Sequence, residues 1–119
     1  MILGQSSIRY LLLIMQAHHL GEPIRMIDIS KKLHVSKATV SLKLKRMMVA
    51  GFLLFEEKSK SLQLTETGLK LGKDVCKSIE VLHEKLLATF SIGDDDSYEW
   101  SIALLGSLRF EEALEVLLK

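Results

Sequence analysis

The densest run of side chains able to contact a polyanion lies between Ser36 and Arg46. Its lysines and arginine can neutralise phosphates, its hydroxyls can bond to phosphates or bases, and its small apolar side chains can meet thymine methyl groups. The residues for which we predict DNA contacts, two later lysines included, are Ser36, Lys37, Ala38, Thr39, Ser41, Leu42, Lys43, Arg46, Lys58 and Lys60. The alternative interpretation of such a charged run is the solvated face of an ordinary helix.

A second set of side chains has the spacing of a metal site. Cys76, Glu80 and His83 recur at the i, i+4 and i+7 positions of one helical face. Thiolate, carboxylate and imidazole are ligands for zinc, iron or manganese, and Glu84 or Glu99 can complete the shell. The competing interpretation is that the cysteine is a small buried apolar residue and the histidine is structural.

Three helices are expected to position the cationic run. Apolar spacing predicts a first helix over Ser6–His19. A second helix is predicted over Asp28–Leu33, with Asp28 as its N-cap. After a tight turn, Ser36 is expected to cap a third helix over Lys37–Ala50, whose core-facing residues recur at helical spacing.

Two short apolar runs, Phe52–Phe55 and Leu62–Leu64, follow the third helix, and the polar segment between them carries Lys58 and Lys60. This pattern predicts a β-hairpin with a basic tip. A helix, a turn, a capped helix and a hairpin, in this order, are the parts of a winged helix-turn-helix, in which the capped helix enters the major groove.

The remaining sequence predicts helices alone. Thr65 is expected to cap a long helix with a broad apolar stripe, and such a stripe needs a partner. Asp96 or Ser97 is expected to cap a helix near Tyr98–Leu105, and a short amphipathic helix follows over Leu108–Leu118. We therefore predict a mainly α fold with a small β-hairpin, in which a winged helix-turn-helix DNA-binding domain (residues 1–68) precedes a helical dimerisation domain (residues 69–119).

The net charge of +1 hides a strong division along the chain. Residues 1–61 carry ten lysines and arginines against four acids, whereas residues 62–119 carry six against eleven. Salt screens charges separated by more than about 8–10 Å, so a phosphate backbone responds to the local basic face. The first half is thus the half that we expect to face DNA.

The order of these parts resembles the iron- and manganese-dependent repressors, the diphtheria-toxin-repressor-like family. The segments that carry the resemblance are Tyr10–Leu12, Met26–Leu33, Ser36–Ser41, Gly51–Leu53 and Leu62–Gly68. Other winged-helix regulators, including the multiple-antibiotic-resistance-type repressors, share the Leu-Thr-x-x-Gly element that ends the last segment. The resemblance implies a DNA-binding winged helix followed by a helical domain that pairs two subunits and binds an activating metal.

The metal ligands that the resemblance implies are mostly missing. On the first helix, Arg9 stands where a Met or Asp ligand is expected, and a cation cannot bind a cation. On the long helix, His83 is followed four residues later by Leu87 in place of a glutamate. Only Glu99 matches an acidic position of the next helix. We therefore predict no regular metal site, and we hypothesise that Arg9 pairs with Glu99, so that a salt bridge replaces a metal bridge.

The sequence lacks the common motifs of enzymes. It contains no glycine-rich phosphate loop, no Gly-x-Ser-x-Gly elbow and no paired carboxylates in a pocket-like pattern, although composition alone leaves a Ser-His-Asp site open. We predict a transcriptional regulator, not an enzyme, that binds an inverted-repeat operator on double-stranded DNA as a homodimer. The alternative is a winged-helix protein-interaction module without a DNA operator.

A cytoplasmic location is expected. The single cysteine, Cys76, excludes an internal disulfide framework and fits a reducing compartment. The apolar run Leu11–Ala17 is too short to cross a bilayer and lacks the flanks of an export signal, so we expect no membrane partner.

Overall fold

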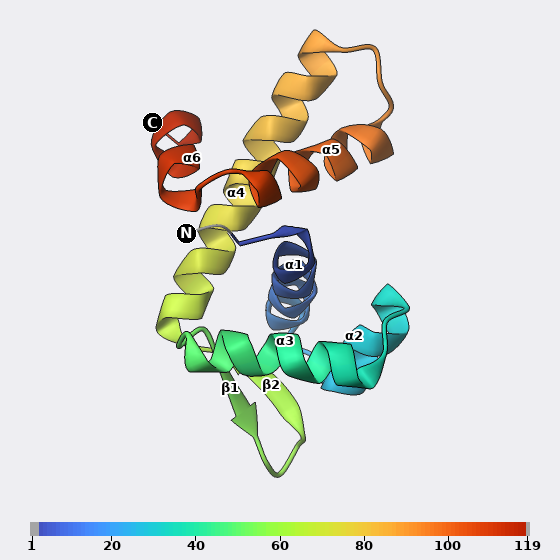
Figure 1. The fold of residues 1–119 in the computed structure, drawn as a ribbon, viewed down its shortest axis with the longest axis vertical. Helices are drawn as coiled ribbons and strands as arrows, with labels where there is room; N and C mark the ends of the chain where they lie inside the picture. Colours follow the sequence, from blue (N-terminus) through green and yellow to red (C-terminus); the bar gives the residue numbers. More distant parts are fainter. Residues whose placement is uncertain (1–2, 119) are drawn as a thin grey trace. The chain divides into compact units, whose positions relative to one another are not determined.

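The computed structural model describes residues 3–118 and confirms the mainly α fold with one small hairpin (Figure 1). The elements in chain order are α1 (Gln5–Leu20), α2 (Met26–Leu33), α3 (Lys37–Val49), β1 (Leu53–Glu56), β2 (Ser61–Leu64), α4 (Glu66–Thr89), α5 (Asp94–Ser107) and α6 (Phe110–Leu117). No helix within the described residues is long and apolar enough to cross a membrane.

The chain divides into two compact units. Residues Tyr10–Gly72 form the first, which we call the winged-helix unit, and residues up to Arg9 together with those from Lys73 onward form the second, which we call the helical unit. Both α1 and α4 are continuous helices that contribute residues to each unit. The start of α1 therefore belongs to the helical unit and its remainder to the winged-helix unit.

A tight turn connects α2 to α3 in the winged-helix unit. His34 ends α2 in the left-handed conformation, with φ of 55°, and its backbone N–H donates to the carbonyl of Ser30. The Ser30 hydroxyl in turn donates to the carbonyl of Val35 at 2.5 Å. These bonds use backbone groups that the end of α2 would leave unpaired, and they fix the direction in which α3 begins.

The hairpin lies beneath α3 in the view of Figure 1, with its tip pointing away from α3. Its strands are antiparallel, with Leu53 opposite Leu64 and Glu56 opposite Ser61. Ile24, between α1 and α2, forms an isolated bridge with Leu62 and so ties the hairpin to the first half of the unit. The core of the unit consists of fully buried apolar side chains: Leu11, Ile14, Ile29, Val40, Leu44 and Leu53.

The junction of the hairpin and α4 is closed by Thr65. Its hydroxyl accepts a hydrogen bond from the N–H of Gly68 at 2.9 Å, as expected of an N-cap, and donates to the carbonyl of Gly51 at 2.6 Å. Gly51 has a φ of 87°, which suits a glycine at the end of α3. One side chain thus holds the end of α3 and the start of α4 together.

The helical unit buries apolar residues from each of its helices. Val75 and Ile79 of α4, Ile102 and Leu105 of α5, and Phe110 of α6 are all buried. Two fully buried serines bond to backbone carbonyls: Ser97 donates to the carbonyl of His83 at 3.0 Å, and Ser101 donates to the carbonyl of Ser97 at 2.8 Å.

Two predicted helix starts are wrong. Asp28 is not the N-cap of α2, because the helix begins two residues earlier, after Arg25, and Asp28 accepts the N–H of Arg25 at 2.8 Å from the third helical position. Asp96 and Ser97 do not begin α5 either, since the helix starts at Asp94 after Gly93. Acidic residues stabilise the whole first turn of a helix, so their presence alone does not single out the cap.

Gly68 gives a test of the packing in the winged-helix unit. A Cβ at this position would lie 2.0 Å from the backbone oxygen of Phe52, whereas a Cβ at Gly72 would meet the flexible side chain of Met15. We expect Gly68→Ala to lower the free energy of unfolding by about 2–3 kcal/mol and Gly72→Ala by less than about 1 kcal/mol, measured by urea unfolding. Equal losses for the two variants would show that the Phe52 backbone yields as readily as a side chain.

Candidate nucleic-acid interface

Helix α3 has one buried and one exposed face. Val40, Leu44 and Met47 are buried and anchor the helix to the unit. The opposite face carries Leu42 and Val49, whose residues are 55% and 90% exposed. Lys45 and Arg46 of the same helix are exposed as well, so the exposed surface of α3 offers both apolar and cationic side chains.

Most of the predicted contact residues are exposed. The exposed ones are Ser36, Lys37, Ala38, Thr39, Leu42, Arg46, Lys58 and Lys60, whereas Ser41 and Lys43 are half-buried at the sides of α3. Lys45, one of the lysines expected to neutralise phosphates, is exposed on α3 as well. Val49 is also exposed but is absent from the predicted contacts; its helical spacing could have identified it, since it lies opposite the Val40–Leu44–Met47 face.

Ser36 fixes the start of α3. Its hydroxyl oxygen accepts a hydrogen bond from the N–H of Thr39 at 3.2 Å, which confirms the predicted N-cap. The same hydroxyl donates to Thr39 Oγ1 at 2.8 Å. The cap therefore sets both the first turn of α3 and the orientation of the Thr39 side chain, which lies on the exposed surface.

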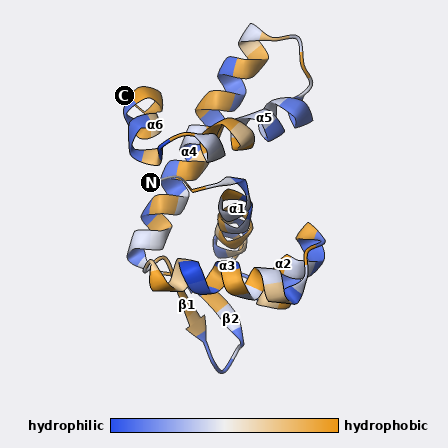
Figure 2. Cartoon of the chain, in the orientation of Figure 1, coloured by the Kyte–Doolittle hydropathy of each residue, from blue (hydrophilic) through white to orange (hydrophobic). Residues whose placement is uncertain are grey.

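The tip of the hairpin is hydrophilic, as Figure 2 shows, but its positive charges have acidic neighbours. Lys60 Nζ lies 3.5 Å from Glu57, and the Glu56 carboxylate accepts the backbone N–H of Lys58 at 3.1 Å. Lys60 also has a φ of 56°, which turns the chain back into β2. Two lysines and two glutamates leave the hairpin tip with no net positive charge, so the cationic surface is concentrated on the helices.

The division of charge follows the two units. Residues 10–72 carry ten basic and five acidic side chains, whereas the rest of the chain carries six basic and ten acidic ones. The winged-helix unit thus has a formal charge of +5 and the helical unit of −4. A polyanion is attracted to the first and repelled by the second at short range.

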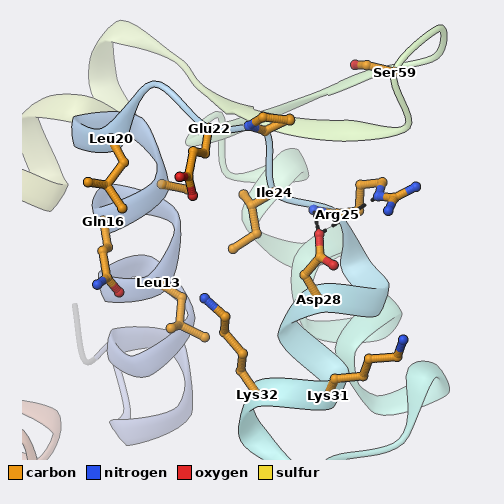
Figure 3. A pocket seen from close by; sticks show the side chains of 12 residues that line it. Leu13, Gln16, Leu20, Glu22, Ile24, Arg25, Asp28, Lys31, Lys32 and Ser59 are labelled. Atoms are coloured by element: carbon orange, nitrogen blue, oxygen red, sulfur yellow. Dashed lines mark hydrogen bonds and ion pairs between the residues drawn. The ribbon is translucent and has the colours of Figure 1, made fainter.

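A groove of about 660 Å³ lies between the end of α1, the start of α2 and the hairpin tip. Leu13, Leu20 and Ile24 give it an apolar lining, and Figure 3 shows Glu22 and Lys32 pointing into it. The charged side chains that line the groove are three basic (Arg25, Lys31 and Lys32) and two acidic (Glu22 and Asp28), so the groove extends the cationic surface only slightly.

The metal candidates of the helical unit do not form a cluster. Within residues 3–118, no three His, Cys, Asp or Glu side chains are close enough together to hold a metal ion. Burial and the nearby Glu80 raise the pKa of the half-buried Cys76 thiol, which disfavours the thiolate that a metal would need. His83 instead directs Nε2 toward Asp94 at 3.4 Å.

Arg9 pairs with Glu99, as hypothesised from the sequence. Arg9 Nη1 donates to Glu99 Oε1 at 3.2 Å, and Nη2 donates to Oε2 of the same carboxylate. The hydrogen bond raises the pKa of Arg9 and lowers the pKa of Glu99. The resemblance assigns the Glu99 carboxylate to a metal, but here both of its oxygens accept hydrogen bonds from the Arg9 guanidinium. Arg9 and Glu99 therefore do not fit a metal ion.

Comparison with solved structures identifies the fold. The chain superposes on the manganese regulator SloR with a TM-score of 0.76 at 20% identity over 96% of its length, and on the metal-dependent transcriptional regulator MtsR with a TM-score of 0.71 at 18% identity over 98%. It also matches the hypothetical protein SSo2273 from Sulfolobus solfataricus, with a TM-score of 0.70 at 19% identity over 94%. No protein-family model and no curated protein matches the sequence.

The chain therefore shares its fold with the matched parts of SloR and MtsR. The predicted resemblance to the diphtheria-toxin-repressor-like regulators is thus confirmed as a winged helix-turn-helix followed by a helical region. The chain spans about half of SloR and MtsR, 53% and 54% of their lengths, and 84% of SSo2273.

The Ser36 cap gives a test of how α3 is held. Ser36→Ala removes the acceptor for the Thr39 N–H and is expected to lower the free energy of unfolding by about 1 kcal/mol. Ser36→Asn, which keeps a capping acceptor, is expected to lose only a few tenths of a kcal/mol. Urea unfolding of both variants measures the difference, and an alanine variant as stable as the asparagine variant would show that the cap does not stabilise α3.

Proposed function

We propose that this protein is a sequence-specific DNA-binding transcriptional regulator, repressor-like in its action, and that it works as a binding protein in the cytoplasm rather than as an enzyme. The observation that carries the proposal is the exposed cationic face of α3, on a fold shared with transcriptional regulators. The local charge of the winged-helix unit supports the same conclusion.

In this proposal α3 enters the major groove. Thr39 and Leu42, near its start, meet base edges and thymine methyl groups, while Lys37, Lys45 and Arg46 contact phosphates on either side. The N-terminal residues of a recognition helix reach deepest into the groove, which agrees with the exposure of Thr39 beside the Ser36 cap. The hairpin then lies against the neighbouring backbone.

We further propose that a second copy of the chain binds the helical unit. Phe90 and Trp100 form an edge-to-face pair with their ring centroids 5.9 Å apart, yet the two residues are 49% and 45% exposed. Leu87 lies in the last turn of α4, three residues before Phe90, and Leu104 lies one turn after Trp100 on α5; both leucines are exposed. An apolar surface of this kind suits a symmetric dimer, whose operator is an inverted repeat with half-sites one or more helical turns apart.

The alternative function, a winged-helix module that binds a protein, differs from a DNA binder in its response to salt. The affinity of a DNA binder falls with ionic strength, with a log–log slope of about −0.9 per phosphate contact. An apolar docking surface gives a slope near zero.

Lys37→Ala tests the DNA-binding face directly. Loss of one phosphate contact is expected to weaken binding to a mixed-sequence DNA duplex and to reduce the magnitude of the salt slope by about 0.9. Fluorescence anisotropy over a range of salt concentrations measures both quantities. Lys85→Ala, which removes an exposed lysine of the helical unit, is the matched control and is expected to keep the wild-type slope. Equal effects of the two substitutions would place the DNA-binding surface elsewhere.

A further inference from the structure

The contact between Arg9 and Glu99 joins two distant parts of the sequence within the helical unit. Arg9 lies in the second turn of α1, Glu99 lies in α5, and the residues are 90 positions apart. Each of the two guanidinium nitrogens donates to a different carboxylate oxygen, the bidentate geometry that adds both energy and directional specificity to an arginine–carboxylate pair. The side chains are 34% and 53% exposed, so the pair lies at the surface in contact with solvent.

A close backbone approach accompanies this ion pair. A Cβ added to Gly106 of α5 would lie 2.9 Å from the backbone nitrogen of Gln5 and 3.1 Å from the carbonyl carbon of Gly4. Ile8, Ile102 and Leu105 are fully buried. The start of α1 and the helix α5 are therefore in direct contact, and the ion pair adds a directional bond to a packed interface.

In this fold, the start of α1 must be held against α5. SloR and MtsR are described as a manganese regulator and a metal-dependent regulator. In this chain, Arg9 replaces an expected ligand, and within residues 3–118 no three suitable side chains lie together. Arginine stays protonated at any physiological pH and offers no lone pair to a metal. A cation is nevertheless present beside Glu99, supplied by the chain itself.

We propose that the Arg9–Glu99 ion pair holds the start of α1 against α5 in the role that a metal ion would otherwise fill, so that the protein binds its operator without a divalent metal. Operator binding without a metal rests on the proposed DNA-binding function, whereas the structural role of the ion pair does not. Because α1 continues into the winged-helix unit, the permanent cation keeps α1 anchored whatever the metal concentration around the protein.

A charge-swap cycle tests the proposal without DNA. Arg9→Glu and Glu99→Arg each place like charges opposite one another, and each is expected to lower Tm by roughly 3–6 °C. The double variant Arg9→Glu/Glu99→Arg restores opposite charges and is expected to recover most of that loss. Additive losses in the double variant would overturn the proposal, because they would mean that the two residues do not interact in solution.

The pH dependence separates an ionic role from a purely steric one. The pKa of Glu99 lies below its ordinary value of 4.5 in the folded protein, so the pair stabilises the fold fully above that pH. The contribution is lost as the pH falls through the lowered pKa, where the carboxylate becomes protonated. We therefore expect the Tm difference between wild type and Arg9→Gln to be constant near neutral pH and to disappear in acid. A difference that persists at low pH would contradict the ionic role.

Independence from divalent metals is tested by a separate measurement. The Tm of the wild-type chain is expected to change by less than about 1 °C between a chelator and excess Mn²⁺, Fe²⁺ or Zn²⁺, because a ligand that does not bind the native state cannot stabilise it. The affinity for duplexes selected from a random-sequence pool is likewise expected to be the same with chelator and with each metal. A rise in either quantity with a metal would overturn the proposal, whereas failure to select any duplex, with the charge-swap cycle intact, would refute only the DNA-binding function.

Discussion

One-sided burial of α3 is the constraint on which the rest of the winged-helix unit depends. Val40, Leu44 and Met47 bind the helix to the core through a single stripe, which leaves the opposite face in water. The Ser36 cap and the Thr65 bridge to Gly51 fix the two ends of that helix by hydrogen bonds to specific backbone groups. A recognition surface requires such fixed ends, because a helix that slides or frays cannot hold side chains in register with base pairs.

The two units differ in formal charge: the winged-helix unit is basic and the helical unit is acidic. The winged-helix unit concentrates cations on α2 and α3, where a phosphate backbone can approach, and leaves the hairpin tip almost neutral through Glu56 and Glu57. The helical unit is acidic, presents an exposed aromatic pair, and joins α5 to the start of α1 through Arg9 and Glu99. In the proposed function, the acidic unit stays away from DNA and its exposed apolar residues contact a second copy of the chain.

Much of the architecture could be predicted from local sequence. The caps at Ser36 and Thr65 were identified correctly, because a hydroxyl before an apolar-periodic segment satisfies backbone donors that every helix start exposes. The predicted start of α2 is two residues too late, since an aspartate at the third helical position can accept the same kind of bond as a cap. Contacts between distant segments leave no local pattern: the edge-to-face packing of Phe90 on Trp100 has no counterpart in the sequence. The Arg9–Glu99 pair was expected only because a family resemblance placed both positions at one site.

The most direct test of the central claim is chemical-shift mapping of the isotope-labelled protein during titration with duplex DNA. The account predicts that the largest backbone amide changes fall between Ser36 and Arg46, with smaller changes at the hairpin tip around Lys58, and that the amides of α5 and α6 stay nearly unchanged. Changes concentrated on α5 or α6, with α3 unaffected at saturating DNA, would contradict the claim that the exposed face of α3 is the surface that binds DNA.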